Sequence, residues 1–284
     1  MLKYLFIFLF IMTASCQKKQ DVKTGINLPS ALEEVSGNEV IADSNGIWMH
    51  NDSGDSPRLF YVNLKGKLIK KIYLDADNED WEDITSDLEG NLYVGDFGNN
   101  SNKREDLEIL IVPHSALKSK DEIEVKRIKF NFEDQKKYPP KKKKLYFDCE
   151  AFFHFNDNLY VFTKSRVEDD YGKTSVYKIP AKEGNHKAKK IGSYNLGKKH
   201  YNWVTGADIR DDGKQVALLT QRDIWLFSDF EKDDFFNGKV SKIHFKHLTQ
   251  KEGICYKNKD TLLVTDEDDH GRGGNLYTYI IPKP

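Results

Sequence analysis

The sequence predicts an all-β fold, and three observations support this class. Short runs rich in valine, isoleucine and aromatic residues alternate with glycine, asparagine and aspartate turns along the chain. No long window repeats apolar residues at the spacing of a helix face. One sequence unit recurs five times, at intervals of 44 to 68 residues. Repeats of about 40–50 residues with four strands each are typical of β-propellers. We therefore predict a single propeller of five four-stranded blades, with six blades as the alternative.

Each repeat opens with an acidic residue and continues as a hairpin. The five openings are Glu34, Glu82, Glu150, Asp208 and Glu252. A strand follows each acid, then a turn of asparagine, aspartate or glycine, then a second apolar strand. These turn residues tolerate positive φ, which tight hairpins need. Two outer strands complete the first four units, at 58–64 and 67–74, 107–113 and 123–132, 175–181 and 188–196, and 223–229 and 240–248.

The fifth unit ends after its third strand, at 274–282. Residues 23–28 read as a strand that precedes the first repeat and can supply the missing fourth strand. We expect this segment to close the ring, because closure leaves no unpaired gap between the first and last blades.

The N-terminus reads as a targeting segment rather than as part of the fold. Lys3 precedes a short apolar run, and small residues lead to Cys16. This layout is that of a signal peptide, and it is similar to the lipobox of bacterial lipoproteins. We predict a signal peptide at 1–15, a lipidated Cys16 with a short linker at 16–22, and a propeller domain at 23–284. Acyl chains such as palmitate would anchor the protein in the bacterial cell envelope, in the outer membrane. An ordinary signal peptide with an incidental cysteine is the alternative.

Composition limits the choice of partners. The chain has 44 basic and 45 acidic residues and a net charge of -1, which gives no overall field for nucleic acid. A small polar ligand or a partner protein remains open, and lipid contact would come through the anchor alone. Cys149 and Cys255 lie in apolar strand patterns, where we expect free thiols.

The candidate site is the mouth of the propeller. The first strand of each blade lies nearest the axis, so the five acids should surround one mouth. The loops between the second and third strands should lie on the same face, at 50–58, 96–106, 163–173, 220–223 and 266–275. They add three possible ligands: Asp52, Asp96 and Asp266. Each loop also contains one arginine, the candidates for an anionic ligand: Arg58, Arg104, Arg166, Arg222 and Arg272.

Acids that share a mouth repel one another by roughly 2 kcal/mol per pair at about 8 Å. Either the arginines neutralise them or a metal ion does, and Ca²⁺ suits a set of oxygen donors. Both solutions remain open at this point. His50 and His270 lie in loops of this face and are weak candidates for acid–base groups. No catalytic residue is assigned.

Several segments carry a resemblance to known proteins: LPSALEEVSG, HNDSG, DWEDI with NLYVGDFGNN, CEAFFHFNDNLYVFTK and TGADIRDDGKQVA. They resemble the bacterial propellers of the SdiA-regulated group and of the esterase-like phytase group. A carboxylate at the start of each inner strand is more distantly similar to the calcium propellers of the gluconolactonase and strictosidine-synthase type. That resemblance implies that Glu34, in the first blade, is a metal ligand.

The sequence therefore favours an envelope lipoprotein that binds a metal or a small polar or anionic ligand at a central mouth. A metal-dependent hydrolase of a phosphate ester or lactone is one alternative. A scaffold for protein partners is another.

Overall fold

The computed structural model of the chain describes residues 25–42, 44–119 and 122–282. Its regular structure is almost entirely β-strand, so the predicted all-β class is confirmed. The helical elements of these residues are short 3-10 turns: η1 (Ser30–Leu32), η2 (His114–Lys118), η3 (Lys142–Lys144), η4 (His200–Asn202) and η5 (Phe235–Asn237). No helix in the described ranges has the length and apolar character to cross a membrane. The predicted signal peptide, Cys16 and the linker lie outside the described residues.

The strands pair in chain order into antiparallel units, and each unit contains a predicted hairpin. The first contains β2 (Val35–Glu39), β3 (Gly46–Asn51), β4 (Arg58–Asn63) and β5 (Leu68–Tyr73). The second contains β6 (Trp81–Ser86), β7 (Leu92–Asp96), β8 (Glu108–Val112) and β9 (Lys126–Phe132). The third contains β10 (Asp148–Phe155), β11 (Asn158–Lys164), β12 (Lys173–Pro180) and β13 (Gly184–Asn195). The fourth contains β14 (Val204–Ile209), β15 (Gln215–Thr220), β16 (Asp223–Ser228) and β17 (Lys239–His244). The last contains β18 (Lys251–Asn258), β19 (Thr261–Asp266) and β20 (Asn275–Ile280), and β1 (Ile26–Asn27) pairs with β20.

The second and third units share one eight-stranded sheet, which the repeat pattern does not predict. The cause is β13, which begins at Gly184 rather than at the expected residue 188. Its first residues, Gly184 to Ala188, pair in parallel with Ile128 to Phe132 of β9. The later part of β13 pairs antiparallel with β12. One long outer strand thus joins the edges of two neighbouring units.

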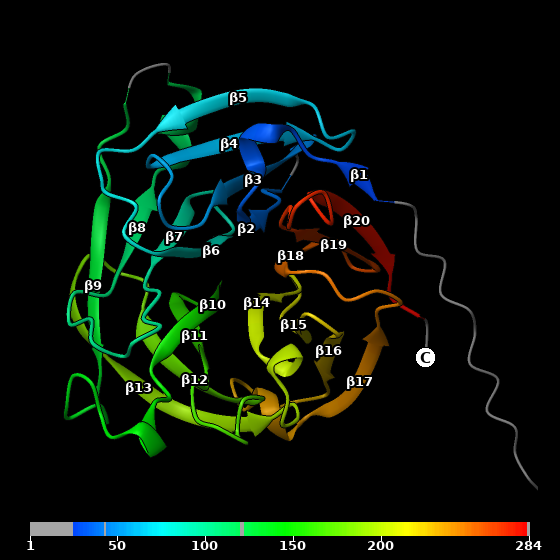
Figure 1. Cartoon of the computed structure of the whole chain (residues 1–284). Coiled ribbons are helices and arrows are strands. Elements are labelled where there is room, and N and C mark those ends of the chain that lie inside the picture. The colour runs from blue at the N-terminus through cyan, green and yellow to red at the C-terminus, as the bar shows by residue number, and fades with distance from the viewer. Residues whose placement is uncertain (1–24, 43, 120–121, 283–284) are drawn as a thin grey trace, which may run out of the picture.

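The sheets stand around a common centre, in the arrangement of a β-propeller (Figure 1). The first strands β2, β6, β10, β14 and β18 are innermost, and each contacts the next one around the ring. Apolar side chains fill the space between neighbouring units. Trp81 and Leu59 lie in the layer between the first and second units, and Leu32 and Leu263 lie between the last and the first. Burial of each large apolar side chain stabilises the fold by about 1.5–3 kcal/mol.

Each inner strand carries a bulge near its start, where the ladder skips one residue. The skipped residues are Ser36, Glu82, Glu150, Thr205 and Glu252. A bulge re-aims a side chain away from the regular alternation of the strand. The two hydroxyl residues point to the neighbouring inner strand: Ser36 Oγ donates to the carbonyl of Glu82 at 2.5 Å, and Thr205 Oγ1 donates to the carbonyl of Lys251 at 2.6 Å.

A buried carboxylate links three of the inner strands. Asp83 follows the bulge of β6 and is fully buried. One carboxylate oxygen accepts the N–H of Ile84 at 2.9 Å, and the other accepts the N–H groups of Phe152 at 3.1 Å and Ala207 at 3.4 Å. Burial raises the pKa of Asp83 well above its ordinary value, while these three N–H bonds oppose that rise. Asp83 therefore ties β6 to β10 and β14 at the centre of the ring.

Candidate metal centre at the central mouth

Three of the five predicted acids occupy the same position of the fold. Glu82, Glu150 and Glu252 are the bulge residues of β6, β10 and β18, near the start of each inner strand. Glu82 is 6% exposed and Glu150 is 3% exposed. The bulges explain why the second, third and fifth repeats bring their glutamates to one end of the ring, which we call the central mouth.

The other two predicted acids do not occupy that position. Asp208 is the fifth of the six residues of β14, three residues past the bulge, so the prediction that it opens this strand is wrong. Glu34 lies just before β2, and its side chain is exposed. Ser36 and Thr205 hold the equivalent bulge positions in these two units. The prediction matched the repeats by their acidic residues, whereas the bulges are the positions that correspond in the structure. When the repeats are matched by their bulges, Asp208 lies near the far end of β14.

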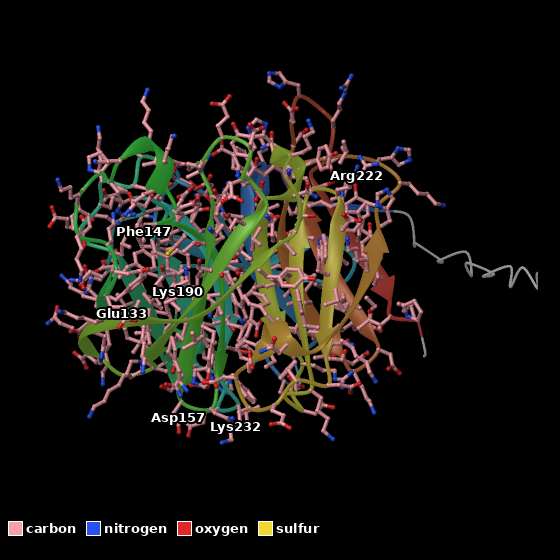
Figure 2. All side chains as sticks on the ribbon, turned by 90° about the horizontal axis from the view of Figure 1, so that it is seen from below. Glu133, Phe147, Asp157, Lys190, Arg222 and Lys232 are labelled. Atoms are coloured by element: carbon pink, nitrogen blue, oxygen red, sulfur yellow. The ribbon has the colours of Figure 1, made fainter. Side chains whose placement is uncertain are left out.

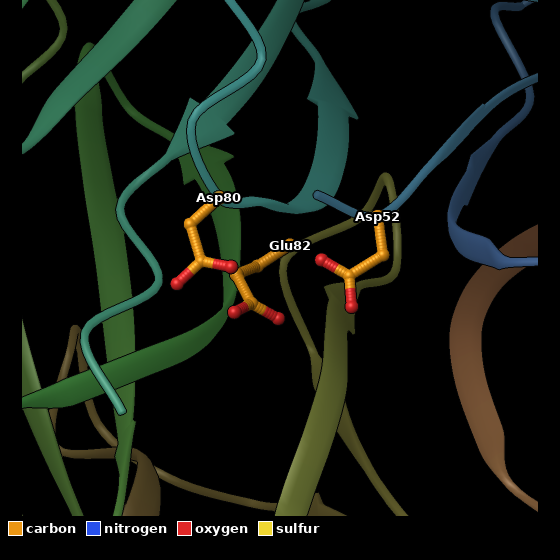
Figure 3. Close-up of side chains that lie close together, drawn as sticks. All are labelled: Asp52, Asp80 and Glu82. Carbon is orange, nitrogen blue, oxygen red and sulfur yellow. The ribbon is translucent and has the colours of Figure 1, made fainter. Parts of the chain in front are cut away.

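A compact carboxylate cluster forms at one side of the mouth. One ligand oxygen each from Asp52, Asp80 and Glu82 can be chosen so that all three lie within 4.8 Å of one another. Their side chains converge from the loop after β3, the loop before β6 and the start of β6 (Figure 3). Asn78 fixes this geometry, because its Nδ2 donates to the Asp52 carbonyl at 2.8 Å and its Oδ1 accepts the N–H of Trp81 at 3.1 Å.

Gly98 lies directly against the same carboxylates. Its N–H donates to the carbonyl of Asp80 at 3.0 Å. A Cβ at this position would collide with the carboxylates of Asp80 and Glu82. The backbone therefore leaves room for the acids only because residue 98 has no side chain. Neither Asp80 nor Gly98 was predicted, because only the acid that opens each repeat and the charged and histidine residues of the loops after the second strands were considered as candidates.

The cluster is electrostatically unfavourable by itself. Burial raises the pKa of Asp52 to about 6, and the charge of Asp80 adds to the rise. Burial, followed by the charges of Glu150 and Asp52, raises the pKa of Glu82 well above its ordinary value. Burial and the charge of Asp148 also raise the pKa of Asp80, although Arg104 opposes that rise. Each shift reflects a cost of holding these carboxylates ionised in this place.

Two cations of the third unit lie near the cluster, and the charge of Lys164 opposes the rise in the pKa of Asp52 and Glu82. Lys164, the last residue of β11, places Nζ 2.7 Å from Glu150 Oε2. Arg166 pairs with Asp148 at 2.5 Å and with Glu150 at 3.4 Å. Both cations lie over the ring of Trp203, at 5.1 Å and 4.9 Å from its centroid. Lys164 was not predicted. The residue of β11 that matches Asp96 and Asp266 in register is Thr163, so an alignment of the second strands contains no signal for Lys164.

The predicted ligands Asp96 and Asp266 accept hydrogen bonds from several segments around the mouth. Asp96 accepts the N–H groups of Glu79 and Asp80, each at 3.2 Å, and pairs with Arg104 at 2.9 Å. Asp266 accepts bonds from three donors: the Thr249 hydroxyl, the Asn275 N–H and the Tyr277 hydroxyl. These carboxylates order the loops that surround the mouth.

The five loop arginines do not form a ring of ion pairs with the five acids. Arg166 pairs with acids at the mouth, and Arg104 pairs with Asp96 behind it. Arg58 pairs with Asp55 of its own loop at 2.6 Å. Arg222 lies over the ring of Tyr201, and Arg272 is exposed. Within the described ranges, Glu82 has no ion-pair partner.

Neither histidine candidate has the environment of a general base. His50 is fully buried beside Trp81, and burial lowers its pKa to about 4. His270 is almost fully exposed and hydrogen-bonds to Asp269 at 2.7 Å. The two cysteines agree with expectation, since Cys149 and Cys255 are buried free thiols.

Comparisons with known proteins add little to this picture. No family model matches the chain, and no curated protein matches it in sequence, so the resemblance to the SdiA-regulated and phytase groups stays a prediction. Among solved structures, a virginiamycin B lyase from Staphylococcus aureus is 12% identical, with 90% of this chain and 69% of that chain covered and a TM-score of 0.43. A gluconolactonase from Xanthomonas campestris is 10% identical, with 88% and 73% covered and a TM-score of 0.48. A streptogramin B lyase is 8% identical, with 93% and 88% covered and a TM-score of 0.45.

Proposed function

We propose that the central mouth binds a divalent cation, Ca²⁺, and through it a small anionic ligand. One observation carries the proposal: the convergence of Asp52, Asp80 and Glu82 within 4.8 Å. Calcium binds oxygen at about 2.3–2.6 Å, so two of its ligands lie at most about 5 Å apart. The three carboxylates meet this condition. A bound cation would also offset the repulsion that raises their pKa values.

The rest of the mouth suits the ligand. Three protein carboxylates leave coordination positions free, because Ca²⁺ takes about 6–8 oxygens. Lys164 and Arg166 supply positive charge at the mouth, and Trp203 supplies an aromatic face beside them. An anionic group that bridges the cation and these two side chains would be held on both sides. This is a binding function, and hydrolysis of a phosphate ester or lactone is not needed to explain the site.

Calorimetry tests the cation. Protein freed of metal with EDTA should give saturable heat with Ca²⁺ at one site per chain. Glu82→Gln and Asp52→Asn should each weaken binding by about tenfold or more, because each removes one ligand charge. Glu231→Gln, a change of an exposed acid remote from the mouth, should bind as the wild type does. Absence of calcium heat in the wild-type protein would contradict the proposal.

We also propose that the fold is a five-bladed propeller that β1 closes. The antiparallel pairing of Ile26 with Leu276 and of Asn27 with Asn275 supports this reading. Ile26 and Leu28 pack on the apolar layer between the last and first units.

Deletion of residues 25–28 should lower the free energy of unfolding of the whole domain by about 2 kcal/mol, because the apolar contacts of Ile26 and Leu28 are lost. Chemical denaturation measures the effect. Deletion of residues 17–22 is the matched control and should leave stability unchanged. Equal stability of the two truncations would argue against closure.

The proposed location is the bacterial cell envelope, with Cys16 as the lipid anchor. The support is the sequence pattern alone, a short apolar run that ends in small residues and a cysteine. Mass spectrometry of the mature protein checks the proposal: the chain should begin at Cys16 and carry acyl chains.

A further inference from the structure

A second cavity lies at the end of the ring opposite to the central mouth. Its volume is about 670 Å³, within the usual range for small-molecule sites. The hairpin turns that follow β2, β6, β10 and β14 surround it, together with the end of β18. Asp157, in the turn after β10, lies at this end of the molecule, whereas Arg222 lies at the other end (Figure 2). The cavity is therefore separate from the proposed calcium site.

Two buried carboxylates form the floor of this cavity. Glu39 is 7% exposed and Asp208 is 8% exposed, and both line the cavity. Asp208 is fixed, because its oxygens accept the N–H groups of Ile209 at 2.7 Å and Tyr256 at 2.6 Å. Glu39 accepts the Ser86 hydroxyl at 2.5 Å through Oε1, while its Oε2 has no hydrogen-bond partner among the described residues. Glu39 thus offers one free acceptor oxygen to a ligand.

The wall beside this floor is aromatic and apolar. Tyr93 and His154 stack with their ring centroids 5.3 Å apart and their planes 16° from parallel. Phe155, Ile41 and Leu64 continue the apolar lining. Burial lowers the pKa of His154, which keeps this side chain neutral near pH 7. A ligand that reaches the floor therefore passes along hydrocarbon and aromatic surface.

Acidic residues outnumber basic ones in the lining. Its acids are Glu39, Asp87, Glu89, Asp157, Asp208 and Asp211, and its bases are Arg210 and Lys257. Arg210 is already paired with Asp212, with its Nε 2.7 Å from Oδ1. The complementary ligand is a cation, because an anion would meet several acidic side chains and, among the described residues of the lining, only one unpaired base, the exposed Lys257. Burial, followed by the charge of Asp208, raises the pKa of Glu39 well above its ordinary value, and burial raises the pKa of Asp208 to about 7, so a neighbouring cation would favour the ionised form of both.

A bare metal ion fits this cavity poorly. Among the described residues, the only group of three side chains with ligand atoms within reach of one ion is the one at the central mouth. Asp208 already accepts two backbone N–H groups. An organic ammonium ion needs fewer oxygens than Ca²⁺, and its hydrocarbon part matches the apolar wall.

We propose that this second cavity binds a small organic amine. Its ammonium group donates to the free oxygen of Glu39 and lies beside Asp208, and its alkyl chain packs on the Tyr93–His154 pair. The acidic rim, with Asp157 and Asp211, attracts the cation and accepts a second ammonium group where the amine has one. Cation–aromatic contact with Tyr93 adds to the attraction.

Putrescine is the probe, and 1,4-butanediol is its uncharged control. Titration calorimetry should give saturable heat with putrescine and none with the diol. Glu39→Gln should weaken putrescine binding by about tenfold or more, because the amide keeps the shape but loses the charge. His154→Ala should weaken binding by a smaller factor. Glu82→Gln, at the other end of the ring, should bind putrescine as the wild type does, so this test is independent of the calcium proposal.

Circular dichroism first establishes that each variant is folded, and Glu39→Gln should fold because Gln can still accept the Ser86 bond. Three results would overturn the inference: no putrescine heat in the wild-type protein, equal binding of the diol, or unchanged putrescine affinity in folded Glu39→Gln. Displacement of putrescine by Ca²⁺ would overturn it as well, because that would make the cavity a metal site.

Discussion

Asp83→Ala should be the most damaging single change in the inner ring. The carboxylate of Asp83 accepts three backbone N–H groups, from Ile84, Phe152 and Ala207, and these belong to three different inner strands. Alanine would leave these donors without a partner in the centre of the fold. Each unsatisfied buried donor costs about 1–3 kcal/mol, so the loss of all three bonds should lower the free energy of unfolding by at least about 3 kcal/mol.

Urea denaturation at neutral pH measures this change. Asp83→Asn should lie between wild type and alanine, because its single oxygen can still accept the N–H groups of Phe152 and Ala207. Glu231→Ala, which removes an exposed carboxylate, is the control and should change stability little. A stability of Asp83→Ala within about 1 kcal/mol of wild type would mean that the ring does not depend on this residue.

The sequence contains enough information for the fold because each repeat carries its own local signals. Turn residues such as Asn156 and Asp157, both at positive φ, mark a hairpin before any long-range contact is known. The parallel contact between β13 and β9 is different. It depends on the spatial approach of two outer strands, and the run that begins at Gly184 contains no local signal for it.

The site was harder to predict because a bulge changes which residue faces the mouth. Glu82 and Asp208 were each predicted to open a repeat. In the structure Glu82 is a bulge residue, whereas Asp208 lies three positions beyond a bulge. Asp80 reaches the mouth from the loop before β6, and Lys164 reaches it from the last position of β11. Tertiary packing, rather than a local sequence pattern, brings both residues to the mouth. The second cavity was not predicted, because its floor joins Glu39 to Asp208 across the ring.

In the absence of metal, the protein should become less stable as pH rises from about 5 to about 8. Burial raises the pKa of Asp52 to about 6 and that of Glu267, near Asp52, to about 7. Carboxylates of the unfolded chain titrate near pH 4. Between those values the native state binds more protons than the unfolded state, so stability falls as pH rises. Together the two groups should account for on the order of 2–4 kcal/mol, at about 1.4 kcal/mol per pH unit of pKa shift.

Calcium should restore the stability that the protein loses as pH rises. The melting temperature at pH 8, with and without Ca²⁺, is therefore the decisive measurement. At about 100 times its Kd, Ca²⁺ adds about 2.7 kcal/mol, and the gain should fade near pH 5 as the carboxylates become protonated. Glu82→Gln separates the two explanations of the mouth. If the acids of the mouth form a cation site, Glu82→Gln in EDTA at pH 8 should be more stable than wild type, and Ca²⁺ should add little to its stability. If ion pairs with Lys164 and Arg166 already balance the mouth, the same variant should be less stable than wild type, because it strands positive charge. The absence of an ion-pair partner for Glu82 among the described residues favours the first outcome.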